Sequence, residues 1–402
     1  MNKNNRWFNF FILYLGGVLV SISQLKIVPI QNEIIQGMRF SFTSISWLMS
    51  IFTLSGIFLS IPGGKFIIKI GPKKLLIMIM LCLILGNVIG FFSESYYLML
   101  ASRLIEGISF SMIIMVGIVF INEWFKGSGR GLATGIWGTF SAAGSLIAMN
   151  LFLPMTKSFG LKSPWLFIAA LTLLMTVIYM FKIKDIKSEE KSADSNEDKE
   201  LFKKAIKNKR IWILALAQGC MAFILFTFIN MLPIIYEQMY GINNTLANRY
   251  AGYFGLFGIP FGIIAGYLID KTKKGNLITL ISFSIMSIAV ILTNALSGSV
   301  SIILQLILLS GGIGLSAACI MIIAPEAVVN KKLIGMSISI VNFVYYIGIF
   351  IGTPCIVKLV EVTNSWKAGI NLMFLVSVMG SILVLLYCKT DIKKNKKVKK
   401  AI

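Results

Sequence analysis

The chain has 402 residues, of which 57% are hydrophobic and only 13% are charged. Soluble domains carry about 25% charged residues, so this composition excludes an ordinary soluble protein. The formal net charge of +22 does not indicate a nucleic-acid-binding protein, because the charges gather between long apolar runs. There is no histidine, and no two cysteines have a metal-binding spacing, so the sequence predicts neither a metal site nor a cofactor.

Long apolar runs follow one another along the chain. Each is about 18–25 residues long, which is enough to cross the hydrocarbon core of a bilayer as a helix. The predicted helices cover residues 8–29, 43–62, 74–92, 97–122, 131–154, 163–182, 210–236, 247–269, 276–294, 299–324, 334–358 and 366–388. Because the runs are continuously apolar and do not alternate, they do not indicate a barrel. The predicted fold class is an all-α membrane protein with twelve transmembrane helices.

The second half of the chain repeats the first at an offset of 202–204 residues. The matching positions are Pro29 and Pro233, Glu33 and Glu237, Gly56 and Gly258, Gly64 and Gly266, and Gly144 and Gly348. Such a repeat predicts two pseudo-symmetric six-helix bundles around a shared centre, which is how many transporters build a substrate site. We expect the bundles to cover residues 1–185 and 209–402, joined by a cytoplasmic linker over 186–208.

The linker is unlike the apolar runs on either side of it. Its core, Ser188–Glu200, is polar, mixed in charge and free of aromatic residues, so it cannot bury enough apolar surface to fold alone. The next segment, Leu201–Lys209, places apolar residues at helical spacing between lysines. This pattern predicts a short amphipathic helix on the inner membrane surface.

The basic residues are distributed asymmetrically between the two sides of the predicted membrane. If the N-terminus lies inside, 30 of the 38 Lys and Arg residues fall on the inner side. This bias predicts a multi-pass plasma-membrane protein with both termini in the cytoplasm. The remaining eight are Lys26, Arg39, Arg103, Lys157, Lys162, Arg249, Lys358 and Lys367. The expected partners are a small-molecule substrate and anionic lipid headgroups at the basic loops, with no nucleic acid and with the chain acting as a monomer.

Two motifs lie in and after the predicted helices of the first half. The loop after helix 2 carries glycines and basic residues at a fixed spacing, namely Gly64, Lys69, Gly71, Lys73 and Lys74. Helix 4 contains Arg103-x-x-x-Gly107. With the internal repeat, these motifs resemble those of the major facilitator superfamily over the whole chain. Three shorter stretches, Ser23–Pro29, Asn122–Phe125 with Arg130–Gly131, and Gly135–Trp137, are loosely similar to the cyanate and nitrate/nitrite-type permease branch.

The resemblance implies that the loop after helix 2 clasps neighbouring helices and gates the inward-facing change. The family pattern has an aspartate where this chain has Ile68. The second copy of the loop keeps the acid as Asp270, followed by Lys271. The gate charge is therefore expected in the second half only.

Charges within a membrane helix are expensive and are functional candidates by default. Arg103 and Glu106 have i, i+3 spacing and can pair on one helix face. Arg103 would hold an anionic substrate or steer a proton to Glu106; alternatively, the pair only fixes helix 4 against a neighbour. Lys26 either extends to the headgroups or faces the cavity beside Gln24. If it faces inward, the three charges sum to +1, which favours an anionic substrate.

Other polar residues lie on helices of the type that lines a transporter cavity. These substrate candidates are Gln218, Asn230, Asn342 and Tyr345, although the favoured interpretation of any single one is a polar contact between helices. Glu123 and Glu326 end helices 4 and 10 on the inner side, and Arg130 follows the first of them. We interpret these three as cytoplasmic gate charges; the alternative is simple solvation at the interface.

No combination of residues typical of an enzyme site is present, so ATP-driven pumping is unsupported. The predicted function is a secondary transporter that works by alternating access on a small, anionic solute, with proton coupling or exchange. A drug or metabolite efflux transporter of the same fold is the first alternative. A membrane sensor that binds a solute without moving it is the second.

Overall fold

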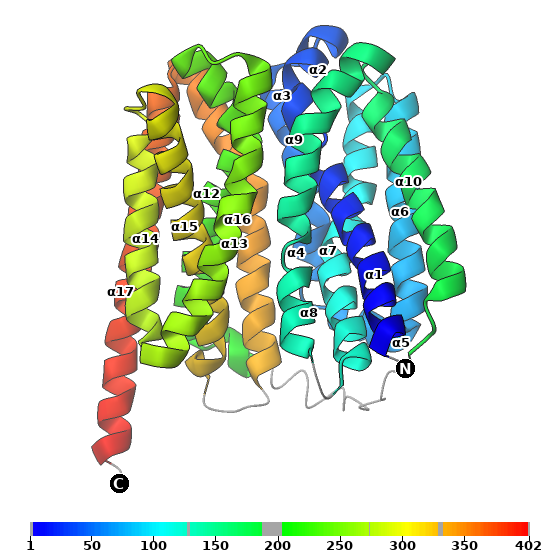
Figure 1. The fold of residues 1–402 in the computed structure, drawn as a ribbon. Helices are drawn as coiled ribbons and strands as arrows, with labels where there is room; N and C mark the ends of the chain where they lie inside the picture. The colour runs from blue at the N-terminus through cyan, green and yellow to red at the C-terminus, as the bar shows by residue number, and fades with distance from the viewer. Residues whose placement is uncertain (1–2, 127–128, 187–202, 273, 329–332, 401–402) are drawn as a thin grey trace. The chain divides into compact units, whose positions relative to one another are not determined.

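A computed structural model describes residues 3–126, 129–186, 203–272, 274–328 and 333–400 (Figure 1). All regular secondary structure in these ranges is helical. Twelve of the described helices or helix runs are long and apolar enough to cross a membrane. Their apolar side chains stay exposed on the outside of the bundles, as expected where lipid is the solvent. The predicted all-α fold with twelve transmembrane helices is confirmed.

The backbone packs into two compact units, which we call unit 1 and unit 2. Unit 1 contains Met1–Lys191 and Asn230–Leu256, and unit 2 contains Ser192–Ile229 and Phe257–Ile402. The helices of the first half are α1 (Lys3–Leu25), η1 (Val28–Ile30), α2 (Gln31–Met38), α3 (Phe42–Ile51), α4 (Leu54–Leu59), α5 (Gly63–Ile70), α6 (Pro72–Phe92), α7 (Tyr96–Trp124), α8 (Arg130–Trp137), α9 (Phe140–Phe159) and α10 (Ser163–Lys182).

The second half contains α12 (Lys209–Tyr240), α13 (Asn244–Thr272), α14 (Gly275–Leu292), α15 (Gly298–Ile323), η2 (Ala324–Ala327), α16 (Ile334–Thr363) and α17 (Trp366–Lys400). Within unit 2, α14 packs against α15 and α17. The packing boundary between the units falls inside α12 and α13, so the division of the chain at residues 186–208 stays a prediction. Most of that linker lies outside the described residues, and residues 203–206 of the expected amphipathic segment are helical.

In unit 1, five of the described helices pack against one another. The hairpin of α6 and α7 packs against α10 through α6, and α1 contacts α7, α9 and α10. Figure 1 shows α1 running from the N-terminus toward the end of unit 1 that carries α2. The inward faces of these helices carry polar side chains, which only a protein interior can accommodate at membrane depth.

The first two membrane-spanning runs are interrupted, which the sequence interpretation did not predict. α1 ends at Leu25, and the chain passes through a turn and η1 before α2 begins at Gln31. Pro29 explains this break, because its ring has no N–H for the carbonyl of Leu25 and clashes with it. The second run is divided at Phe52 and Thr53, where the Thr53 hydroxyl donates to the carbonyl of Ser50 at 2.8 Å. Both breaks leave carbonyls at a helix end without intrahelical donors.

Candidate functional site

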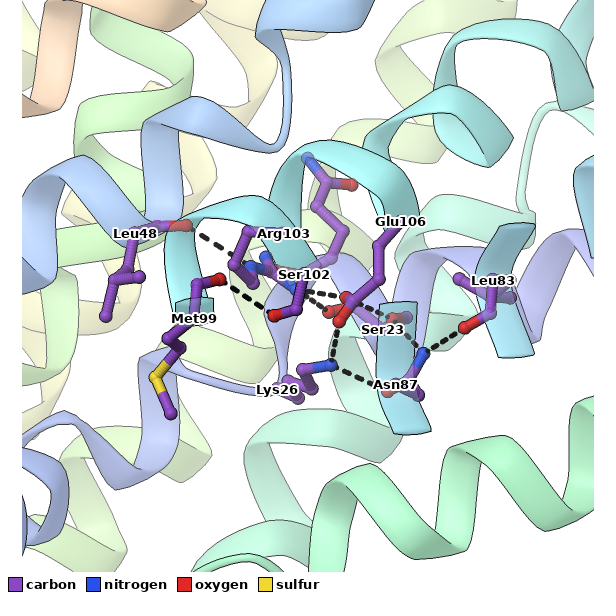
Figure 2. A network of polar contacts seen from close by, with 10 residues as sticks. Ser23, Lys26, Leu48, Leu83, Asn87, Met99, Ser102, Arg103 and Glu106 are labelled. Carbon is purple, nitrogen blue, oxygen red and sulfur yellow. Dashed lines mark hydrogen bonds and ion pairs between the residues drawn. The ribbon is translucent and has the colours of Figure 1, made fainter. Parts of the chain in front are cut away.

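A network of buried charges lies inside unit 1, centred on the carboxylate of Glu106 in α7 (Figure 2). Lys26 Nζ lies 2.7 Å from Glu106 Oε1, and Arg103 Nη1 lies 2.6 Å from Glu106 Oε2. The Ser23 hydroxyl donates to the same Oε2 at 2.8 Å. One carboxylate therefore accepts hydrogen bonds from two cations and a hydroxyl. We call Ser23, Lys26, Asn87, Arg103 and Glu106 the charge network.

Lys26 occupies the turn directly after α1, where the helix has stopped at Leu25. Its Nζ donates to Asn87 Oδ1 at 2.6 Å, and Asn87 comes from α6. The ammonium also lies 4.9 Å from the ring centroid of Trp165 in α10, within the range of a cation–π contact. These contacts join α1, α6, α7 and α10 at one point. Lys26 therefore faces the interior of the bundle and does not extend to the headgroups.

Arg103 satisfies the carbonyls that both helix breaks leave open. Its Nη1 and Nη2 donate to the carbonyls of Ser23 and Gln24 at 2.7 Å each, in the last turn of α1. Its Nε donates to the carbonyl of Leu48 at 3.2 Å, in the last turn of α3. A cation is stabilised at a helix C-terminus by the helix dipole as well as by these bonds. The guanidinium therefore links the ends of two interrupted helices.

The glycine of the Arg103-x-x-x-Gly107 motif allows the same break to approach α7. A Cβ on Gly107 would collide with the backbone carbonyl of Phe52, the residue directly after α3. The Phe52 ring in turn lies 4.4 Å from the Arg103 guanidinium carbon. The spacing of the motif thus has a local explanation, because its two residues contact the same interruption in the second membrane run.

The charges of the network do not cancel. Lys26, Arg103 and Glu106 are all 0% exposed, and together they carry a formal charge of +1. No further Asp or Glu forms an ion pair with these three in the part of the chain that the structure describes. Burying an excess charge costs several kcal/mol, roughly, even after relaxation of the surroundings. A buried excess charge at membrane depth makes the network a candidate for function.

The structure joins some of the predicted site residues and separates others. Arg103 and Glu106 pair as their spacing predicts, and Lys26 joins them. Gln24 is buried and contributes its backbone carbonyl to the network. Asn87 and Trp165 were missed, although Asn87 is a lone amide within the apolar run 74–92 and could have been singled out. Their roles, like those of the predicted residues, remain proposals.

The remaining substrate candidates come from the second half. Gln218 is buried in α12, and its Oε1 has no hydrogen-bond partner among the described residues. Asn230, in the same helix, is buried, and Asn342 in α16 is partly exposed. Tyr345 packs its ring 6.3 Å from Phe226 and 5.6 Å from Tyr346. None of these belongs to the charge network.

The loop after helix 2 contacts α10 through a basic residue of the first motif. Lys73 Nζ donates to the carbonyl of Met180 at 2.9 Å, in the last turn of α10. Gly71 has φ of 88° and forms the turn that lets Pro72 begin α6. Lys69 and Lys74 are exposed. The side chain of Ile68 and the surroundings of Gly64 lie outside what the structure describes.

Other predicted gate residues make local contacts. Glu123 pairs with Lys126 at 2.7 Å on the surface, and Arg130 is exposed at the start of α8. Lys271 Nζ lies 5.7 Å from the ring of Tyr267. The side chains of Asp270 and Glu326 lie outside the described parts. Within the described ranges, no group of three His, Cys, Asp or Glu residues could hold a metal ion.

Known proteins resemble this chain at low identity. A probable sulfoacetate transporter of Cupriavidus necator is 22% identical over 67% of the chain and 64% of its own length. A probable nitrate/nitrite transporter of Mycobacterium tuberculosis is 24% identical over 62% of the chain and 63% of its own length. The chain therefore spans less than two thirds of these relatives. A multidrug resistance protein of Bacillus subtilis matches as well.

Among solved structures, a bacterial homologue of the human lysosomal transporter Spinster, in an inward-facing and unoccupied conformation, has the same fold. Its TM-score is 0.77 at 15% identity, with 98% of this chain and 99% of the other covered. The family model of the Major Facilitator Superfamily matches residues 7–353, which is most of the chain. With twelve membrane helices and the two motifs in place, the chain belongs to the major facilitator superfamily.

Proposed function

We propose that the chain is a secondary transporter of a small anionic solute, coupled to protons through the charge network. It works by alternating access as a monomer in the plasma membrane, with both termini in the cytoplasm. The observation that carries the proposal is the formal charge of +1 on three fully buried groups. The positive-inside distribution of 30 of 38 basic residues supports the orientation.

The excess positive charge of the network would couple the binding of a proton to the binding of an anion. A guanidinium is not deprotonated in proteins, and Glu106 is already a carboxylate in this count, so the proton that the network releases is that of Lys26. When that proton leaves, the network is neutral and attracts an anion less. An anion near the network favours the protonated form, and protonation favours the anion, because the coupling is reciprocal.

The electrostatic attraction between the network and an anion is large enough to affect the affinity without direct contact. Two unit charges 10 Å apart interact by about 1.7 kcal/mol at an effective dielectric constant of about 20. That is more than a tenfold effect on an equilibrium constant, since about 1.4 kcal/mol corresponds to tenfold. The substrate therefore need not displace the contacts of Arg103 with the helix ends. Two relatives named for nitrate and sulfoacetate transport support an anionic solute.

Drug efflux is the second candidate function. The multidrug resistance relative favours it, and so would a cavity lined by some of the 29 Phe and 20 Met residues. A lipophilic cation would be repelled by the charge network, whereas an anion would be attracted. A sensor that binds without transport is a third possibility, which a flux measurement separates from the other two.

The test is uptake into proteoliposomes that contain the purified full chain. We expect labelled nitrate or sulfoacetate to accumulate when the outside is made acidic, and to exchange with internal anion without a pH gradient. Ethidium should not be moved. Ethidium flux without anion flux would favour efflux, and anion binding without counterflow would favour a sensor.

A matched pair of variants tests the network itself. Lys26→Met leaves the Arg103–Glu106 pair neutral, so anion accumulation should no longer respond to the pH gradient. Lys157→Met removes an exposed cation outside the network and should leave the response unchanged. A normal pH response in Lys26→Met would contradict the proposed coupling.

A further inference from the structure

A groove of about 1030 Å³ opens at the end of unit 1 that carries α2. It lies between the ends of α2, α6 and α9 and the start of α10, and it is separate from the charge network. Ligand pockets in proteins hold about 300–1,000 Å³, so this groove is large enough for a sizeable molecule. We call it the rim groove.

The apolar part of the rim groove is open on the outside of the described helices. Phe91, Leu166 and Ala170 line it, and Leu166 is 54% exposed. Ala170 follows the start of α10 at Ser163 by two helical turns, so the lining descends about 10 Å along the helix. An apolar channel that starts at a helix end and runs down the lipid-facing side suits a hydrocarbon chain.

The mouth of the rim groove is charged. Arg39 follows the end of α2, Lys162 precedes α10, and Glu94 follows α6, which gives a formal charge of +1. None of the three forms an ion pair in the described part of the chain. The positive-inside distribution leaves only eight basic residues away from the inner side, and two of them meet here. Two cations without ion-pair partners above an apolar channel are complementary to an anionic amphiphile.

We propose that the rim groove binds an anionic phospholipid of the surrounding leaflet. The phosphate interacts with Arg39 and Lys162, and one acyl chain lies against Phe91, Leu166 and Ala170. The proposal does not depend on the transported solute, because the groove shares no residue with the charge network. In the proposed orientation the lipid belongs to the outer leaflet.

The experiment measures lipid binding to the delipidated full chain by native mass spectrometry. The probes are phosphatidylglycerol and phosphatidylcholine of equal chain length. A basic residue near anionic lipid contributes about 1 kcal/mol, so the double variant Arg39→Gln, Lys162→Gln should weaken phosphatidylglycerol binding about tenfold or more. The control Arg249→Gln, Lys367→Gln removes two exposed cations outside the groove and should bind normally. Equal binding by both double variants would overturn the proposal.

Two more variants keep the test decisive. Glu94→Gln removes the acid at the mouth and should strengthen phosphatidylglycerol binding, an effect that a misfolded protein would not give. Ala170→Trp fills the apolar channel and should weaken binding of the long-chain lipid. It should leave the dihexanoyl form, whose chains end higher in the groove, nearly unaffected. Unchanged binding in both variants would place the lipid elsewhere.

Discussion

The helices α7 and α15 are counterparts in the repeat, yet only α7 is charged at depth. They begin after Ser95 and Ser297, an offset of 202 residues, so Arg103 corresponds to Gln305. Arg103 bridges two helix ends, whereas Gln305 donates to the hydroxyl of Thr293 at 2.9 Å. At the 204-residue offset of helices 1 and 7, Lys26 corresponds to Asn230.

The matching prolines Pro29 and Pro233 also lie in different local structures. Pro29 interrupts the first membrane run, but Pro233 lies within the continuous helix α12. An interrupted helix needs donors for its last carbonyls, and Arg103 provides them in the first half. The second half has a neutral glutamine at that position. Interruption and buried charge therefore occur together, and we infer that the first half carries the proton chemistry.

The largest expected effect comes from Arg103→Ala compared with Gln305→Ala. Loss of Arg103 leaves three helix-end carbonyls without a donor, and breaking a buried ion pair costs about 3–5 kcal/mol. Glu106 keeps Lys26 as a partner, so the protein should still insert, with a lower Tm and no transport. Gln305→Ala should cost about 1–3 kcal/mol and retain transport. Thermal unfolding and uptake check both; equal losses would remove the contrast between the halves.

Glu106→Gln should separate exchange from accumulation. The variant keeps Arg103 at the helix ends but removes the carboxylate that pairs with the Lys26 ammonium, so Lys26 lies beside Arg103 without a counter-charge and no longer holds its proton. Anion exchange should persist, while accumulation driven by a pH gradient should fall about tenfold or more, the effect of about 1.4 kcal/mol. Counterflow and pH-jump uptake in the same proteoliposomes measure the two. If accumulation survives, proton binding at Lys26 does not depend on Glu106.

The two prolines offer a sharper test of the helix break. Pro29→Ala lets α1 continue past Leu25, so the N–H groups of Ile27 and Val28 can bond the carbonyls of Ser23 and Gln24 in competition with Arg103, which should slow transport. Pro233→Ala removes a proline from a continuous helix, where it is unfavourable by up to about 3 kcal/mol, and should leave Tm unchanged or higher. Uptake rates and thermal unfolding of the two variants distinguish these outcomes. Slower transport in Pro233→Ala, with normal transport in Pro29→Ala, would mean that the second half and not the first depends on its proline.

The two copies of the motif loop, after helices 2 and 8, are expected to differ the other way round. Here the second half, not the first, carries the functional charge. Asp270→Asn should slow the conformational cycle more than Ile68→Ala, because only the second copy has the acid of the family motif. Ile68→Asp should not add to transport, since the first loop is already held by Lys73 on α10. Exchange rates and cysteine accessibility on the inner side provide the measurement. Normal cycling in Asp270→Asn would exclude the gate role.

The smallest effect is expected in the linker between the repeats. A flexible segment of equal length in place of Ser188–Glu200 should leave uptake nearly unchanged, because this stretch has no apolar core to lose. The comparison is with the same number of substitutions in α10. Loss of activity at normal expression would assign the linker a specific role.

The sequence alone predicted the number and approximate ends of the membrane helices, because length and hydropathy determine them. It predicted the pair of Arg103 and Glu106, because i, i+3 neighbours share a helix face. It did not predict the break at Phe52. No proline marks that break, and it depends on Gly107 of another helix allowing close approach.

The direction of Lys26 was left open for a similar reason. A lysine one turn from a helix end can extend outward or inward with little difference in sequence pattern. Its orientation is determined by Asn87 and Trp165, which come from helices remote in the chain. The rim groove likewise combines residues from four separate segments, and periodicity within one helix does not reveal such a convergence.

The contact between Lys26 and Trp165 gives the protein an optical reporter of its own. An indole ring 4.9 Å from an ammonium experiences a strong local field, and that field disappears when the ammonium loses its proton. The emission of Trp165 should therefore record the charge of Lys26 in real time. With the other six of the seven tryptophans replaced, stopped-flow fluorescence could follow proton movement during a single transport cycle without any added dye.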